Sequence, residues 1–402
     1  MNTTSNLRQI EHVREAARAL GASTRETRDQ VLHRFAAALR RDEAEILTVN
    51  AEEVLRAREA GTSEVLVDRL VLDPERLESM AQAIEQVAAL EDPLGIVLEE
   101  RTLEKGLQLR KVTVPFGVVC VVYEARANVT ADAAAIAIKT GNGIVLRGSS
   151  TAVDTNRAIL DRLYFALEDS GISEACIWNF PADDRDAFRE LVGLEGGIDL
   201  LIPRGGEALK QFLFEHARVP ILAAAGGNCH IFIDESAPRD MARDIVLNAK
   251  TQRPGVCNAA ETLLVHQARA HDLLPYLTAH LENKGVKIRT DEASFGEEFL
   301  DMEMTVTTVA DVDEAIAHIN RHGTGHSEAI VTADQEHADA FTQGVDAAVV
   351  YVNASTRFTD GGVFGLGAEV GISTNKLHAR GPMGLRELTT TKYIVQGDGH
   401  IR

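Results

Sequence analysis

The chain has 402 residues, and 61 acidic against 41 basic residues give it a formal net charge of −20 at pH 7. A negative surplus of this size repels a phosphate backbone, so nucleic acid is not an expected partner. The length exceeds what a single hydrophobic core usually supports, so we expect more than one compact unit.

No apolar run of signal-peptide or transmembrane length occurs in the sequence, which predicts a cytoplasmic protein without a membrane partner. The four cysteines are too few and too scattered for a disulfide framework. Cys120, Cys176 and Cys229 lie in or beside apolar runs, as buried free cysteines commonly do. Cys257 lies in no such run.

The first part of the chain, from residue 7 to about 90, repeats apolar residues at helical spacing and predicts a helical segment. Residues 101–114 then alternate apolar and charged side chains, which indicates a strand or hairpin. The apolar run 118–123, an Ala-rich helix and the run 143–146 follow, a pattern typical of two parallel strands joined by a crossover helix.

Further strands are expected near 198–202 and 231–233, so this part of the chain predicts a doubly wound α/β domain. A second α/β unit is expected after residue 251. Its predicted elements are strand 261–265, helix 270–282, strand 305–309 and helix 313–320.

Cys257 follows the Pro254-Gly255 turn and directly precedes a predicted strand. A thiolate in such a loop can attack an acyl carbon if a helix terminus or a nearby cation lowers its pKa. The alternative is an ordinary free cysteine, and the spacing alone leaves both interpretations open.

Two stretches could bind phosphate groups, because each follows a strand and precedes a helix, where free N–H groups converge. The first contains Arg147, Gly148, Ser149 and Ser150, and the second contains Gly205 and Gly206. Ser and Gly also cap many helices without binding anything. Two such stretches in consecutive units favour a dinucleotide, although the G-x-G-x-x-G and G-x-x-x-x-G-K-[ST] fingerprints are both missing.

His318, His322 and His326 recur at every fourth residue. Such spacing could place imidazoles on one helix face as metal ligands. No H-E-x-x-H pattern accompanies them, and Gly323 and Gly325 interrupt the helix. We therefore expect packing or hydrogen bonding for these histidines and predict no metal site.

With these residues in hand, the chain resembles the γ-glutamyl phosphate reductase family of the aldehyde dehydrogenase superfamily, and the likeness runs almost end to end. The stretches that carry it are 123–130 (YEARANVT), 201–206 (LIPRGG), 248–254 (NAKTQRP) ahead of Cys257, 318–328, 351–362 (YVNASTRFTDGG) and 377–382 (LHARGP).

The resemblance implies an aldehyde-dehydrogenase-like α/β fold with two doubly wound α/β domains and a small oligomerisation arm. Residues 1–100 and 115–250 would form the NADPH-binding domain, and 251–384 the catalytic domain. Residues 101–114 and 385–402 would form the arm. An exposed hairpin with alternating apolar positions needs a partner, so we expect a homo-oligomer.

The resemblance also assigns roles to residues. Cys257 would be the nucleophile, and Asn128 would donate a hydrogen bond to the oxyanion. Arg147, Gly148, Ser149 and Ser150 would lie along the adenosine ribose and phosphates of NADPH, Gly205 and Gly206 near its pyrophosphate, and Glu298 at its nicotinamide ribose. Arg357 or Arg380 could pair with the carboxylate or phosphate of the substrate, or form an ordinary surface ion pair instead.

The expected reaction is the NADPH-dependent reduction of glutamyl 5-phosphate to glutamate 5-semialdehyde, through a thioester on Cys257, in proline biosynthesis. A glutamate 5-kinase that supplies the unstable substrate is a candidate partner. Hydrolytic relatives carry a glutamate two residues before a Gly-Gly pair, whereas this chain reads Ala223-Ala224-Ala225-Gly226-Gly227. We therefore expect no general base for water there.

The sequence departs from the family at Ala127, where proline is usual, in the Ala-rich approach to Gly226, and in a short stretch around 287–294. Two other functions are considered. A hydrolytic aldehyde dehydrogenase would not require phosphate to oxidise the semialdehyde. A catalytically silent nucleotide-binding protein would bind NADPH while Cys257 stayed unreactive.

Overall fold

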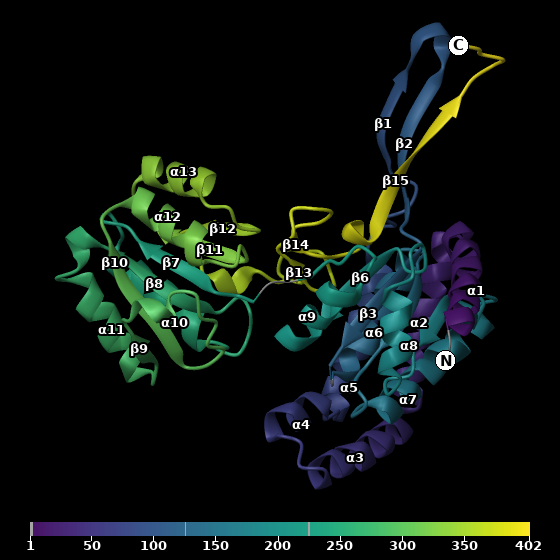
Figure 1. Cartoon of the computed structure of the whole chain (residues 1–402), viewed down its shortest axis with the longest axis horizontal. Helices are drawn as coiled ribbons and strands as arrows, with labels where there is room; N and C mark the ends of the chain where they lie inside the picture. The colour runs from purple at the N-terminus through teal and green to yellow at the C-terminus, as the bar shows by residue number, and fades with distance from the viewer. Residues whose placement is uncertain (1–2, 125, 224–225) are drawn as a thin grey trace. The chain divides into compact units, whose positions relative to one another are not determined.

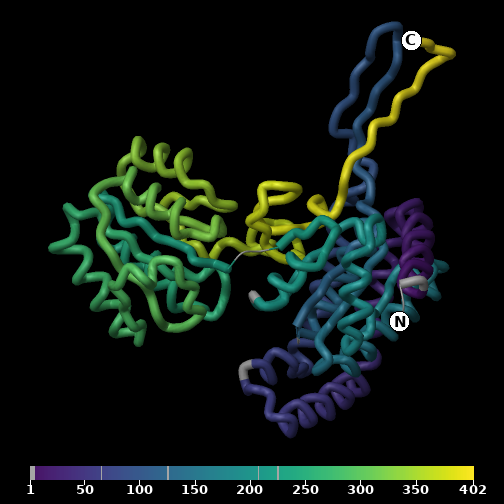
Figure 2. Tube along the Cα trace, in the orientation of Figure 1, coloured from purple at the N-terminus to yellow at the C-terminus, as the bar shows by residue number. Residues whose placement is uncertain are grey.

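The computed structural model describes residues 3–124, 126–223 and 226–402. It divides into two compact units. Unit 1 extends to Leu222 and also includes 366–371 and 383–402, and unit 2 comprises 223–365 and 372–382. The Cα trace shows the end of the chain, in yellow, contributing to unit 1 (Figure 2).

The helices of unit 1 are α1 (Thr3–Ala22), α2 (Arg25–Arg41), α3 (Glu43–Glu59), α4 (Glu64–Leu70), α5 (Pro74–Ala89), α6 (Ala127–Lys139), α7 (Val153–Asp169), α8 (Arg185–Val192) and α9 (Glu207–His216). Its strands are β1 (Val97–Thr102), β2 (Gln108–Pro115), β3 (Val118–Tyr123), β4 (Gly143–Arg147), β5 (Ile177–Asn179), β6 (Leu200–Arg204) and β15 (Thr389–Gln396).

Helices α1 to α5 confirm the helical prediction for residues 7–90. Local chemistry sets several of their starts. The Thr24 hydroxyl accepts a hydrogen bond from the Thr27 N–H at the start of α2. The Asp73 carboxylate does the same for the Arg76 N–H at the start of α5, where Pro74 occupies the first turn. Both residues satisfy backbone donors that have no partner within the helix.

The central sheet of unit 1 is parallel and has the strand order β5-β4-β3-β6. Every residue of β3 is buried, as expected for an apolar strand inside a parallel sheet. The chain runs from β3 outward to β4 and β5, and then returns to place β6 on the other side of β3. The carboxyl ends of β3 and β6 therefore meet at a topological switch point, where open α/β sheets bind ligands.

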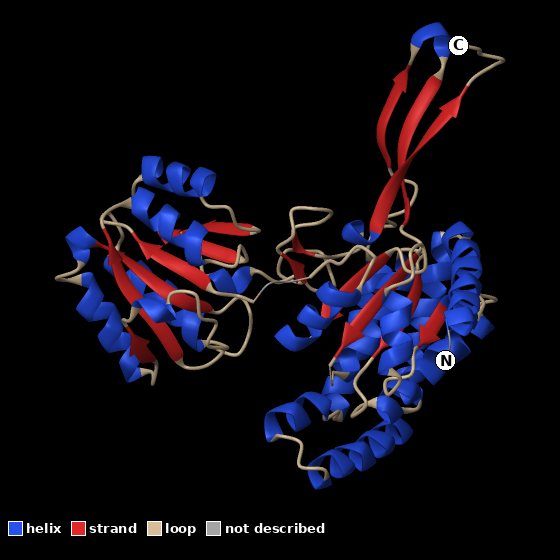
Figure 3. Ribbon diagram, viewed as in Figure 1, coloured by secondary structure: helices blue, strands red, loops and turns tan. Residues whose placement is uncertain are grey.

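A separate antiparallel sheet, β1-β2-β15, forms an arm on unit 1, shown as three long red strands in Figure 3. Strand β2 pairs with β1 on one side and with β15 on the other. Leu98, Tyr393 and Val395 are each more than half exposed on this sheet. The predicted hairpin at 101–114 is thus part of a larger sheet, which begins at Val97 and includes the C-terminal strand.

Unit 2 has helices α10 (Arg239–Thr251), α11 (Leu273–Asn283), α12 (Val312–His322) and α13 (Gln335–Gly344). Its strands are β7 (Cys229–Ile233), β8 (Ala260–His266), β9 (Lys287–Arg289), β10 (Glu303–Val309), β11 (Ser327–Val331), β12 (Val349–Val352), β13 (Ile372–Ser373) and β14 (Gly381–Pro382). Figure 1 labels most elements of both units.

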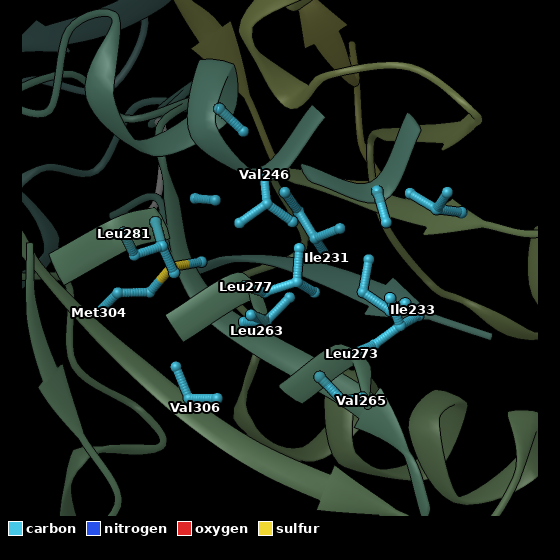
Figure 4. Packing of buried hydrophobic residues seen from close by; sticks show 14 of the residues in the cluster. Ile231, Ile233, Val246, Leu263, Val265, Leu273, Leu277, Leu281, Met304 and Val306 are labelled. Carbon is cyan, nitrogen blue, oxygen red and sulfur yellow. The ribbon is translucent and has the colours of Figure 1, made fainter. Parts of the chain in front are cut away.

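The main sheet of unit 2 is parallel in the order β12-β11-β7-β8-β10-β9. Helices α10 and α11 cover one face over a core that includes Ile231, Val246, Leu263 and Leu277 (Figure 4). Helices α12 and α13 pack with a second cluster around Phe232 and Leu264. Two units of this kind confirm the predicted α/β fold class.

The boundary between the units differs from the predicted one at residue 251. Strand β7 and helix α10 were expected in the first domain, but they belong to unit 2. The reason is strand pairing, because β7 lies between β8 and β11 in the sheet of unit 2. In the part of the chain that the structure describes, no helix is both long and apolar enough to cross a bilayer.

The core of unit 2 predicts a strong effect for truncation of Leu263, which is fully buried in β8. Leu263→Ala should lower the free energy of unfolding of unit 2 by about 3 kcal/mol, because it removes buried contacts and leaves a cavity. Met241 on α10 is 39% exposed, and Met241→Ala should cost less than about 1 kcal/mol. The effect of each substitution on stability is measured by hydrogen exchange of the β8 amides. Equal exchange rates in the two variants would contradict the assignment of this core.

Candidate active site

Cys257 lies in the loop 252–259 between α10 and β8, and it is half-buried. The side chain of its neighbour Asn258 donates a hydrogen bond from Nδ2 to the Thr359 carbonyl, at 2.8 Å. The Thr356 hydroxyl donates to the Asn258 carbonyl at 2.7 Å. These two bonds fasten the loop to the segment 356–359, which holds the sulfur in one region of unit 2.

The backbone of Cys257 also contacts Gly227 and the Cys229 thiol. A Cβ placed on Gly227 would lie 1.6 Å from the Cys257 carbonyl oxygen, so only glycine fits there. The Cys229 thiol lies 3.2 Å from the same oxygen, and burial raises its pKa well above the usual range. Cys229 therefore stays protonated and donates to the Cys257 carbonyl. Cys120, Cys176 and Cys229 are all buried, as predicted.

Arg357 supplies positive charge beside the loop. Its Nε donates to the Gln252 side-chain oxygen at 3.0 Å, and its Nη1 donates to the Asn258 side-chain oxygen. Burial lowers the pKa of Arg357, as does the like charge of Arg253, whereas Cys257 acts in the opposite direction. Arg357 is therefore the candidate for the nearby cation that the sequence argument required, and its role at Cys257 stays a prediction.

A carboxylate from elsewhere in the chain lies at the Gly226-Gly227 pair, and the expectation that no general base for water is present there stays a prediction. The carboxylate belongs to Glu298, whose Oε1 accepts a hydrogen bond from the Gly227 N–H at 2.6 Å. A Cβ on Gly226 would lie 2.5 Å from the other Glu298 oxygen. The acid comes from a segment distant in the sequence, so the alanine run could not reveal it. Ala224 and Ala225 lie outside the described residues.

Arg380 takes part in an ion pair in unit 2. Its Nη1 lies 2.8 Å from a carboxylate oxygen of Asp346, and Lys376 binds the second oxygen at 2.5 Å. Arg380 also donates to the Asp346 carbonyl. Its substrate-binding role stays a prediction, and the alternative of an ordinary ion pair is satisfied in the structure.

Asn128 lies in unit 1, on the first turn of α6, and its side chain is exposed. Its Nδ2 donates to Asp132, one helical turn further along, at 3.1 Å. This bond places the amide nitrogen, rather than the oxygen, on the Asp132 side. Burial raises the pKa of the Asp132 carboxyl to about 6, although Asn128 and the charge of Arg204 lower it. Asp132, Arg204 and Glu369 line a small cavity with room for about one water molecule.

The loop after β4 contains the first predicted phosphate-binding stretch. Arg147 is half-buried, donates to the Ala182 carbonyl at 3.0 Å and stacks on Phe188. A Cβ on Gly148 would lie 2.4 Å from the Asn156 side chain, so glycine is required there. The Ser149 hydroxyl bonds to the hydroxyl and the N–H of Thr151 in a turn before α7. The N-cap of α7 is Ala152, so neither Ser149 nor Ser150 caps this helix as the alternative supposed.

The second stretch follows β6 at the switch point of the same sheet. The Gly206 N–H, at the start of α9, donates to the Glu124 carboxylate at 2.8 Å. Glu124 directly follows β3 and lies 3.8 Å from Arg69. The helix start therefore already holds an anionic group, which suits a position that attracts negative charge.

Two of the three histidines pack as rings, and the third forms a hydrogen bond. His318 and His322 lie 4.7 Å apart between ring centroids, and Phe295 contacts both. His326 is buried and bonds to the Ser327 hydroxyl at 2.9 Å. Among the described residues, no group of three or more His, Cys, Asp or Glu side chains is arranged to hold a metal ion.

With both units described, the chain can be compared with known proteins. The model of the aldehyde dehydrogenase family matches residues 3–296 and 286–394. The γ-glutamyl phosphate reductase of Caldanaerobacter subterraneus is 46% identical over 97% of both chains, and γ-glutamyl phosphate reductase 1 of Bacillus licheniformis is 48% identical over 94% of both. The crystal structure of γ-glutamyl phosphate reductase from Thermotoga maritima superposes with a TM-score of 0.96, at 44% identity over 99% of both chains.

The chain belongs to the γ-glutamyl phosphate reductases of the aldehyde dehydrogenase family. An acetylating aldehyde dehydrogenase from Geobacillus thermoglucosidasius, with a TM-score of 0.70 at 17% identity, shares the fold. Membership in the γ-glutamyl phosphate reductases confirms the resemblance read from the sequence. The roles of individual residues stay predictions.

The sequence alone did not single out several residues that lie close to predicted site residues. Asp132 could have been found, because it stands four residues after Asn128 on a predicted helix. Arg253 lies in the quoted stretch before Cys257, and Glu124 in the stretch before Asn128, but spacing alone assigned neither a role. Only the folded chain shows their neighbours.

The raised pKa of Asp132 predicts a pH-dependent effect on stability. Ionisation of a carboxyl whose folded pKa lies above its unfolded value disfavours the folded state, so stability falls as pH rises from about 4 to about 6. Asp132→Asn should therefore raise the melting temperature at pH 8, and this gain should shrink toward pH 4. Asp186, exposed on α8, provides the control Asp186→Asn. A gain for Asp132→Asn that is the same at both pH values would contradict the prediction.

Proposed function

We propose that this chain reduces glutamyl 5-phosphate to glutamate 5-semialdehyde with NADPH, through a thioester on Cys257. The observation that carries the proposal is the half-buried Cys257 in a fastened loop beside the Arg357 guanidinium. Identity of 45–48% with curated γ-glutamyl phosphate reductases, over nearly the whole chain, supports the choice of substrate.

The first step is attack by the Cys257 thiolate on the acyl carbon. A carbon–sulfur bond forms, and the bond to the phosphate oxygen breaks, with the electron pair leaving on phosphate. The positive charge of Arg357 stabilises the thiolate before attack. Asn128 is proposed as a side-chain donor to the anionic oxygen, and such a donor contributes about 3 kcal/mol in comparable sites.

NADPH, when bound, supplies the hydride that reduces the thioester carbon. The carbon–sulfur bond then breaks, which releases the aldehyde and restores the thiolate of Cys257. The proposed cofactor residues in unit 1 are Arg147, Gly148, Ser149, Ser150, Gly205 and Gly206. Their two stretches follow β4 and β6, which flank β3 in one parallel sheet, so both lie at the edge where dinucleotides bind. Glu298 is proposed at the nicotinamide ribose.

Substrate recognition is proposed for Arg357, with Arg380 as the second candidate. A guanidinium can bind carboxylate or phosphate through two parallel hydrogen bonds. Because acyl phosphates hydrolyse readily in water, a glutamate 5-kinase is proposed as the partner that delivers the substrate.

A hydrolytic aldehyde dehydrogenase remains the second candidate function, because the Glu298 carboxylate lies at the Gly226-Gly227 pair. A carboxylate beside the thioester could activate water. However, the Glu298 oxygen Oε1 already accepts the Gly227 N–H, and that bond holds the carboxylate at the Gly227 backbone. The requirement for phosphate separates the two functions.

The reverse reaction tests the proposal directly. NADP⁺ reduction by the cyclised semialdehyde, pyrroline-5-carboxylate, should require inorganic phosphate, because phosphate must release the acyl group from sulfur. Cys257→Ala should abolish this turnover while NADPH binding, measured by fluorescence titration, stays unchanged. Phosphate-independent turnover would indicate the hydrolytic enzyme, and turnover by the Cys257→Ala variant would overturn the mechanism.

The arm predicts a homo-oligomer, because the edge strands β1 and β15 expose apolar side chains. Val395→Lys combined with Leu98→Glu should shift the protein toward monomers, since charges replace exposed apolar residues that a partner would cover. Phe214, 59% exposed on α9, supplies the control Phe214→Lys, which should leave the assembly unchanged. Sedimentation velocity measures the oligomeric state of the wild type and of both variants. A monomeric wild-type protein would contradict the prediction.

A further inference from the structure

Two opposite charges are buried on either side of the nucleophile loop. Lys250 near the end of α10 and Glu261 in β8 lie 2.5 Å apart between Nζ and Oε2, and both side chains are fully buried. Burial raises the pKa of Glu261 to about 7, although Lys250 lowers it. Apolar residues of similar size often stabilise the folded state as much as a buried ion pair does, or more. Stability alone therefore does not account for the Lys250–Glu261 pair.

The second oxygen of Glu261 reaches another segment of unit 2. It accepts a hydrogen bond from the Leu300 N–H at 3.3 Å. Leu300 has a φ of 53°, in the left-handed region that residues with a Cβ rarely adopt. The residue is 46% exposed, so tight packing of its side chain is not what holds this conformation. Backbone in such a conformation persists only when its surroundings hold it, and Glu261 is one of the groups that do.

Leu300 is two residues from Glu298, whose carboxylate accepts the Gly227 N–H. Gly227 in turn packs directly on the Cys257 backbone, with no room for a side chain between them. A continuous series of contacts therefore connects the buried pair to the proposed nucleophile. It passes from Glu261 to Leu300, then through Glu298 to Gly227, and ends at Cys257.

We propose that the Lys250–Glu261 pair positions the nucleophile, by fixing the segment 298–300 so that Glu298 holds Gly227 against the backbone of Cys257. Both members act through other residues and touch no reacting atom. The inference rests on the proposed function only in taking Cys257 as the reactive thiol. It gives a reason for burying two charges beside a reactive loop, where a displacement of about 1 Å can cost roughly a hundredfold in rate.

A matched pair of double variants tests this role. Lys250→Met with Glu261→Leu removes both charges and the acceptor for the Leu300 N–H. Lys250→Met with Glu261→Gln also removes both charges, but the Gln carbonyl can still accept that N–H. The measurement is the rate of Cys257 alkylation by iodoacetamide across pH 6–9, followed by mass spectrometry of the Cys257 peptide.

The Leu variant should alkylate Cys257 at a rate changed by about tenfold, whereas the Gln variant should stay near the wild-type rate, because it keeps the bond to Leu300. Equal rates in the two variants would overturn the proposal. Lys139 and Asp29 form a comparable pair in unit 1, also at 2.5 Å. Lys139→Met with Asp29→Leu is therefore the control, and its Cys257 should react as in the wild type.

A double-mutant cycle tests the route through Glu298, and its single variant Glu298→Ala does not depend on the Leu variant being stable. Glu298→Ala should change the alkylation rate by itself, and an unchanged rate would overturn the route. Adding Lys250→Met with Glu261→Leu to Glu298→Ala should not change the rate further. If the Lys250 and Glu261 changes act independently of Glu298, the effects on log rate will add, and the route is wrong. Alkylation uses no substrate or cofactor, so these results stand even if the phosphate test rejects the proposed reaction.

Discussion

The structure of unit 2 depends on one close backbone approach, in which Gly227 lies against the carbonyl of Cys257. No residue with a Cβ fits there. The Cys229 thiol, the Thr356 hydroxyl and the Asn258 side chain then fasten the same loop by hydrogen bonds. Backbone contacts of this kind can fix the position of a thiol without burying it deeply. A nucleophile needs both a fixed position and access for its substrate.

Charge at this loop comes from distant parts of the chain. Arg357 approaches from the segment after β12, and Glu298 from the segment before β10. In a chain with a net charge of −20, a cation beside the sulfur is not a consequence of composition. It is placed there by specific hydrogen bonds to Gln252 and Asn258, and its effect is local because those side chains hold it next to the loop.

Unit 1 uses the geometry of a parallel sheet in a similar way. The predicted cofactor residues occupy two loops that follow neighbouring strands of β3, and parallel strands bring such loops to one edge. At this edge the Gly206 N–H holds the Glu124 carboxylate. The start of α9 therefore holds a negatively charged side chain of the same chain, as the partial positive charge of a helix start favours.

The sequence by itself determined the α/β class, most strands and helices, and the family, because apolar periodicity and long matching stretches are local properties. It singled out Cys257 by its Pro-Gly turn, but spacing alone did not decide between a reactive thiol and an ordinary free cysteine. Tertiary structure decided the boundary of the units, because β7 pairs with β8 and β11 rather than with the sheet of unit 1. It also decided which groups surround Cys257. Glu298 and Arg357 lie 41 and 100 positions further along the chain, and pairing between such distant residues depends on strand order and loop packing, which no local pattern encodes.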